Sequence, residues 1–173
     1  MPMYDLYVCN RGDTARFILG KSGCSKLHVI GLNPSKANRE KADTTVAKVE
    51  RVAQRSAYEG FVMANLYPLR ATDPQDLPVE HNVRLSRRNI LEIVDSFGGQ
   101  PPVMWAAWGV NISSRSYLLK ACIKLHREVA NRGGRWVHYG KLCQQGHPRH
   151  PSRLSYQWSF TEFDMAAYLA AMT

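Results

Sequence analysis

The sequence has no long apolar run and no paired cysteines. No stretch approaches the roughly 18 consecutive apolar residues of a membrane helix, so we expect no membrane partner. Residues 1–5 lack a basic segment followed by an apolar one, so we expect no signal peptide and a cytoplasmic protein. No C-x-x-C pair is present, which gives no support to a zinc site or a redox dithiol and favours ordinary reduced thiols. The four cysteines are Cys9, Cys24, Cys122 and Cys143.

Acidic residues are few compared with basic ones. The 173 residues include 14 Asp and Glu but 23 Lys and Arg, for a formal net charge of +9. This excess favours a polyanionic partner, nucleic acid or a nucleotide first. Charge alone fits equally well with a basic surface that only maintains solubility, because the basic residues are spread along the chain. The chain has no repeat, low-complexity tract or linker, so a single domain over residues 1–173 is predicted.

Short apolar stretches alternate with helical patterns. We expect strands at 26–31, 61–66, 103–108 and 135–139, and helices at 45–57, 80–96 and 114–131. A capping box formed by Ser159 and Glu162 is expected to open a last helix that runs to about residue 171. Apolar stretches on either side of Gly12 and Asp13 predict an N-terminal β-hairpin. The alternation predicts a three-layer α/β/α sandwich around a central four-stranded, mostly parallel sheet.

The predicted helices each carry an apolar stripe. In helix 45–57 the residues expected inside are Val46, Val49, Val52 and Ala53. In helix 80–96 they are Val83, Ile90, Leu91 and Val94. The aromatic residues Trp105, Trp108 and Trp136 are expected in the core.

Polar or glycine-bearing turns follow the predicted central strands. Because the carboxyl ends of parallel strands meet at one edge of a sheet, we expect these turns to enclose a pocket. An Asn at such a position offers both a donor and an acceptor, which suits the edge of a nucleobase. Each residue also has an ordinary interpretation, since Asn is a common turn former and the loop His and Arg side chains are often solvated. The loop that carries His147 and His150 is rich in proline, which lowers the entropy cost of holding it.

The order of these turns resembles the motifs of the uracil-DNA glycosylase superfamily. Gly31-Leu32-Asn33-Pro34-Ser35 is similar to the first motif of its mismatch-specific branch, and the apolar run that ends at Asn65 is similar to its base-reading strand. Trp108-Gly109 matches a later strand end, and residues 150–155 (H-P-S-R-L-S) are similar to the last motif. The resemblance implies a glycosylase-like α/β fold and cleavage of an N-glycosidic bond with the base taken out of the stack.

The same resemblance implies roles for individual residues. Asn33 would position a water near C1′, and Asn65 would bond the Watson–Crick edge of the flipped base. His150, or else His147, would stabilise negative charge on the departing base. No cofactor or metal is expected. The residues expected to bind substrate are Gly31, Pro34, Ser35, Lys36, Asn65, Tyr67, Arg70, Trp108, Gly109, Arg149, Ser152 and Arg153.

The sequence departs from the glycosylase pattern in three places. Asn33 stands where one branch has a general-base Asp, residues 35–45 contain no aromatic, and Arg153 replaces a proline of the last motif. Tyr67 is a candidate for the missing stacking aromatic. A non-catalytic module that binds nucleic acid or nucleotide on the same fold is therefore an alternative. A third class is a small-ligand enzyme that uses Asp43, His147 and His150 as acid–base or metal groups.

A closer resemblance covers nearly the whole chain. The segments G-L-N-P-S, N-L-Y-P-L-R-A-T-D-P and G-H-P-R-H-P are similar to signatures of a bacterial and phage family known as domain of unknown function 1643. That family name implies no activity.

Overall fold

A single mixed β-sheet of seven strands forms the centre of the molecule. The computed structural model describes all of residues 1–173. Along the sheet the strand order is β1-β2-β4-β3-β5-β6-β7. The strands are β1 (Leu6–Cys9), β2 (Arg16–Lys21), β3 (Lys26–Gly31), β4 (Gly60–Asn65), β5 (Val103–Ala106), β6 (Arg135–Tyr139) and β7 (Phe160–Glu162).

The four middle strands β4, β3, β5 and β6 run parallel to one another. Their apolar residues are buried on both faces, as is typical of parallel strands covered by helices. The sheet is larger than the predicted four strands because elements on both sides extend it. The expected N-terminal hairpin is formed by β1 and β2, and its strand β2 pairs antiparallel with β4. At the other side of the sheet, β7 pairs antiparallel with β6.

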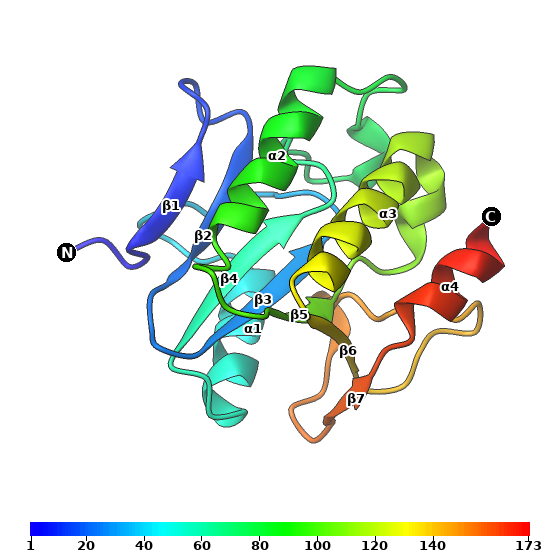
Figure 1. Cartoon of the computed structure of the whole chain (residues 1–173). Helices are drawn as coiled ribbons and strands as arrows, with labels where there is room; N and C mark the ends of the chain where they lie inside the picture. Colours follow the sequence, from blue (N-terminus) through cyan, green and yellow to red (C-terminus); the bar gives the residue numbers. More distant parts are fainter.

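Four helices cover the two faces of the sheet (Figure 1). Helix α1 (Thr44–Arg55) packs on one face, where its buried Val and Ala residues contact side chains of β3 and β4. Helices α2 (Val83–Asp95), α3 (Ser116–Asn131) and α4 (Met165–Met172) pack on the other face. The apolar stripe expected in α1 is confirmed, because Val46, Val49, Val52 and Ala53 are all buried. No helix is both long and apolar enough to cross a membrane.

Two predictions about the helices are wrong. Residues 160–162 form β7, not the first turn of a helix, and the last helix is capped instead by Asp164, whose carboxylate accepts from the Ala167 amide at 2.9 Å. In α2, Val83 and Leu91 are 64% and 59% exposed, whereas Asn89 and Ile93 are buried. The helix turns its Asn89 side inward because that side chain donates to the Asn65 carbonyl at the end of β4.

The order in which the chain adds strands to the sheet reverses at β3. From β3 the chain passes through α1 to β4 on one side, and then through α2 to β5 on the other side of β3. In open α/β sheets such a reversal leaves a crevice at the carboxyl ends of the two strands, where ligands bind. The fold therefore places a crevice beyond Gly31 and Ala106, the last residues of β3 and β5.

Candidate functional site

A cavity of about 450 Å³ lies at this reversal point. Its walls come from the turns after β3 and β5, from the loop after β4, and from the long segment after β6. It therefore joins parts of the chain that are more than a hundred residues apart. The lining residues are Leu32, Asn33, Pro74, Trp108, Gly109, Val110, Asn111, Cys143, Arg149, His150, Ser152 and Arg153.

Asn33 presents a hydrogen-bond acceptor to the cavity. Its Nδ2 donates to the carbonyls of Pro34 at 3.1 Å and Ala71 at 2.8 Å. Both partners are acceptors, so they fix the orientation of the amide, and Oδ1 has no partner within the protein. The Ala71 amide donates to the Pro34 carbonyl in return, at 2.9 Å, which fixes the turn that carries Asn33.

His150 presents a donor to the same cavity. It is the N-cap of a short 3₁₀-helix, Pro151–Arg153, and its Nδ1 accepts from the Ser152 amide at 3.2 Å and lies 2.8 Å from the Ser152 hydroxyl, which can also donate to it. An Nδ1 that accepts from a backbone amide leaves the ring proton on Nε2, which has no partner within the protein. Burial lowers the pKa of His150 below its usual range, and the Asp43 carboxylate opposes this effect only in part. This shift favours the neutral ring at pH 7.

Gly109 allows the His150 ring to sit at this wall. Gly109 has φ +73°, a conformation that side-chain-bearing residues rarely adopt, and a Cβ there would lie 3.2 Å from the Cβ of His150. The glycine that ends the β5 turn thus leaves room for the last loop to close over the sheet edge.

His147 does not line the cavity. It is buried, and its Nδ1 lies 2.9 Å from the hydroxyl of Tyr168 in α4. That hydroxyl accepts from Trp108 Nε1 at 3.1 Å, so its own proton is available for His147. Burial lowers the pKa of His147, which favours the neutral ring. His147 therefore attaches the loop after β6 to the last helix.

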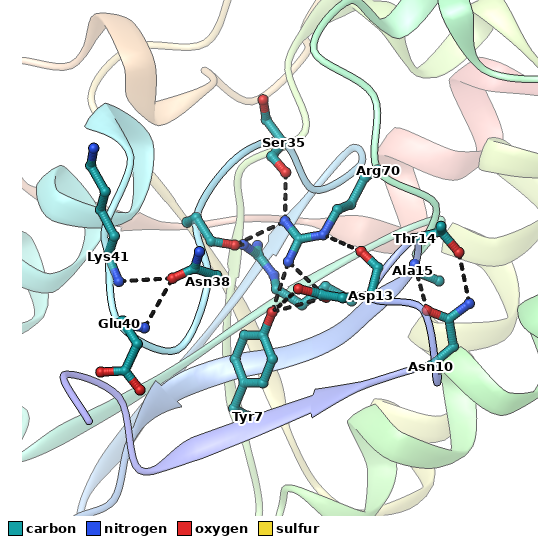
Figure 2. Close-up of polar contacts among 12 residues, drawn as sticks. Tyr7, Asn10, Asp13, Thr14, Ala15, Ser35, Asn38, Glu40, Lys41 and Arg70 are labelled. Atoms are coloured by element: carbon teal, nitrogen blue, oxygen red, sulfur yellow. Dashed lines mark hydrogen bonds and ion pairs between the residues drawn. The ribbon is translucent and has the colours of Figure 1, made fainter. Parts of the chain in front are cut away.

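Arg70 also lies outside the cavity, where it holds the loop after β3 (Figure 2). Its guanidinium donates to the carbonyls of Ser35 at 2.6 Å and Ala37 at 2.9 Å, and to the Asp13 carbonyl at 2.8 Å. It further contacts the Asp13 carboxylate and the Tyr7 hydroxyl. Arg70 thus ties the N-terminal hairpin to the segment that follows Asn33.

The two expected base-contacting residues of the β4 turn face inward. Asn65 is 1% exposed, and its Oδ1 lies 2.7 Å from the point where a Cβ on Gly31 would be, so Gly31 makes room for it. Tyr67 is buried against Tyr117, and its hydroxyl accepts from the Asn82 amide at 3.0 Å. Neither side chain lines the cavity.

The remaining predicted residues divide between the cavity and the loop beside it. Trp108, Arg149, Ser152 and Arg153 line the cavity. Pro34 is buried, Ser35 contributes a carbonyl to Arg70, and Lys36 is exposed to solvent. The tryptophans Trp105, Trp108 and Trp136 are buried as expected, although Trp108 also contributes to the wall.

Sequence reasoning missed several lining residues, of which Asn111 is the most polar. It lies in a short 3₁₀-helix, Val110–Ser114, directly after the turn at Gly109. The signal was present, because Asn111 follows a strand end by a few residues, as Asn33 does. Cys143 also lines the cavity, and all four cysteines are free.

The cavity carries positive charge and hydrogen-bonding groups but no carboxylate. Among its lining residues are two arginines, one neutral histidine and two asparagines. This set suits an anionic ligand that also needs a neutral donor and acceptor, such as a nucleotide. No group of three or more His, Cys, Asp or Glu side chains is placed where it could hold a metal ion.

Comparison with known proteins identifies one related family. A model of a protein family of unknown function, DUF1643, matches residues 16–152. No curated protein and no solved structure matches the chain. The matched region runs from β2 to Ser152, two residues past His150, so it includes every lining residue of the cavity except Arg153. The chain therefore belongs to the DUF1643 family.

Proposed function

We propose that this protein hydrolyses the N-glycosidic bond of a nucleotide residue, either in DNA or in a free nucleotide. The observation that carries the proposal is the pairing, in one cavity, of the free Asn33 Oδ1 with the neutral His150 ring, whose Nε2 proton is also free. The two residues come from the first and last of the motifs that resemble the uracil-DNA glycosylase superfamily. Their meeting in one cavity supports that comparison.

The proposed reaction uses each group according to its hydrogen-bonding capacity. Asn33 Oδ1 accepts a hydrogen bond from a water and aims its oxygen at C1′. The C1′–N bond breaks with its electron pair going to the base, which leaves an oxocarbenium-like sugar. His150 Nε2–H donates to the anionic base and stabilises it. The water oxygen then bonds C1′, and its proton passes to the departed base or to solvent.

The positive residues at the cavity mouth would bind the phosphate. Arg153 and Ser152 are exposed, and Arg149 is partly exposed beside them. Arginine offers several N–H donors in a planar fork that matches phosphate oxygens. A neutral base-stabilising ring, an acceptor for water and a cationic phosphate site together make up the parts that the reaction needs.

A second candidate is a binding module without catalysis. The absence of any Asp or Glu from the cavity wall favours it, since no group there has the strength to take a proton from water. The arginines would still attract a nucleic acid or nucleotide.

An assay with oligonucleotide substrates distinguishes the hydrolase from the binding module. We expect the protein to release bases from single-stranded or mismatched oligonucleotides that carry uracil or modified bases, or from free nucleotides, with abasic product as the readout. The variant His150→Asn keeps an acceptor for the Ser152 amide but loses the ring N–H, and we expect it to lower kcat by about a hundredfold. His150→Gln, whose amide N–H can reach the Nε2 position, should retain more activity.

The other results are equally informative. Salt-sensitive binding without cleavage of any substrate favours the binding module. Neither cleavage nor binding, even at low salt, would remove both candidates.

A further inference from the structure

A second cavity lies next to the candidate site and shares one wall with it. Its volume is about 400 Å³, and its lining includes Gly140, Lys141, Arg149 and Trp158. Arg149 lines this cavity and the first one alike. Arg149 therefore lies at the border of both cavities.

Arg149 is held in place with its terminal nitrogens free. Its Nε donates to the Lys141 carbonyl at 2.6 Å, which fixes the plane of the guanidinium. Its two terminal nitrogens have no partner within the protein. A fixed guanidinium with free N–H groups between two cavities is placed to bind a phosphate that links one ligand unit to the next.

Trp158 gives the second cavity an aromatic surface. The indole is partly exposed, whereas Trp105, Trp108 and Trp136 are each buried. It packs so closely on Gly140 that a Cβ there would lie 2.4 Å from a ring carbon. The Arg149 guanidinium carbon lies 5.3 Å from the ring centroid. The guanidinium lies over the ring, and Gly140 and the cation together hold the indole in place.

The chemistry of this surface matches one class of ligand. Aromatic side chains that alternate with cations in a groove bind single-stranded nucleic acid, because every base can stack and every phosphate is anionic. The other lining residues, Gln157, Ser159 and Thr161, are exposed and polar, and no carboxylate is present.

We infer that the protein takes a single-stranded polynucleotide, with one nucleotide in the first cavity and its neighbour stacked at Trp158. Arg149 binds the phosphate between the two nucleotides, and Lys141 adds a second positive charge. This inference rests on the proposed function, since it assumes that the first cavity takes a nucleotide. It narrows the substrate from a nucleotide in general to a residue within a strand.

Intrinsic fluorescence provides the test. Trp158 is the one partly exposed tryptophan of four, so a base stacked on it should quench the solvent-exposed part of the emission. The probes are thymidine monophosphate, an oligothymidylate and an oligouridylate of about eight nucleotides, and the same oligothymidylate in a duplex. We expect the single strands to bind at least about tenfold more tightly than the mononucleotide and the duplex.

Variants locate the contact. Trp158→Ala should weaken binding of the single strand at least about fivefold, the lower end for loss of one base–aromatic stack, and leave the mononucleotide affinity within about twofold. Trp158→Phe keeps an aromatic ring and should retain most of the affinity, which also controls for folding. Arg149→Ala should lower the salt dependence of binding, whereas Lys124→Ala, which removes an exposed charge from α3, should not.

The outcomes separate this inference from the proposed function. Equal affinity for mononucleotide and single strand, or an equal loss of both in Trp158→Ala, overturns the inference and leaves the proposed function standing. No binding of any probe overturns both. Tighter binding of oligothymidylate or of oligouridylate supports the inference and assigns DNA or RNA, respectively.

Discussion

Replacing Arg70 with lysine tests how the loop after β3 is held. The Arg70 side chain is 18% exposed and bonds three residues in two segments: Asp13 in the N-terminal hairpin, and Ser35 and Ala37 in the loop after β3. Lysine offers three donors from a single point and cannot span these partners. We therefore expect Arg70→Lys to destabilise the protein although the charge is kept.

The size of the effect follows from which groups lose their partner. The Ala37 carbonyl keeps its bond from Arg16 at 2.9 Å, so it stays paired. The carbonyls of Ser35 and Asp13 each lose a bond from a charged donor, worth about 1.5–3 kcal/mol before water replaces part of it. The Asp13 carboxylate is 43% exposed, so its ion pair with Arg70 adds little. We expect a loss of about 2–3 kcal/mol in the free energy of unfolding.

Urea unfolding followed by circular dichroism measures this loss. For a chain of this size the same loss lowers Tm by about 4–12 °C. The control is Arg84→Lys, at an exposed position of α2 without a hydrogen bond, which should change the free energy by less than about 0.5 kcal/mol. Equal urea midpoints for Arg70→Lys and the native protein, at an unchanged m value, would refute the structural role of Arg70.

Two further predictions concern single positions. Gly109→Ala should reduce substrate turnover or binding more than Gly133→Ala does. Both glycines have positive φ (+73° and +68°), but only a Cβ at Gly109 meets His150. Equal effects of the two substitutions in an oligonucleotide assay would contradict this prediction. His28 is buried, and desolvation lowers its pKa from the ordinary 6.5 to about 4. As the pH falls, the unfolded chain therefore takes up this proton at a higher pH than the folded protein does. The contribution of His28 to the free energy of unfolding is fully present above pH 6.5 and is lost progressively towards pH 4, by roughly 3 kcal/mol. In urea titrations across this range His28→Gln should show a shallower pH dependence, and an unchanged slope would show that other groups cause it.

Much of the fold follows from local sequence pattern. The strand at residues 26–31 and the strand at 135–139 have the predicted bounds, and α1 buries the predicted Val and Ala stripe. These elements are predictable because each pattern is local. An apolar run with turn residues at its ends indicates a buried strand, and apolar residues at helical spacing indicate a helix with one buried face. The last helix was misplaced because Ser159 and Glu162 have capping-box spacing, yet pairing with β6 makes residues 160–162 a strand.

The candidate site was predictable only in part. Asn33, Gly109 and His150 meet in one cavity, as the strand-end argument expects. The same argument cannot tell a side chain that faces the cavity from one that turns inward, since strand ends are defined by the backbone alone. Asn65 turned inward because Gly31 leaves room for it, and His147 because Tyr168 of the last helix offers a hydroxyl.

The sequence by itself determined the α/β character, the excess positive charge and the turns that carry polar groups, because these depend on residues that are neighbours in the chain. Only the tertiary structure decided that Arg70 is a tether for the β3 loop and that Arg149 stands between two cavities. Both depend on contacts between residues far apart in sequence. A guanidinium group has the same composition whether it binds backbone carbonyls or faces solvent, so only its position in the fold separates the two roles.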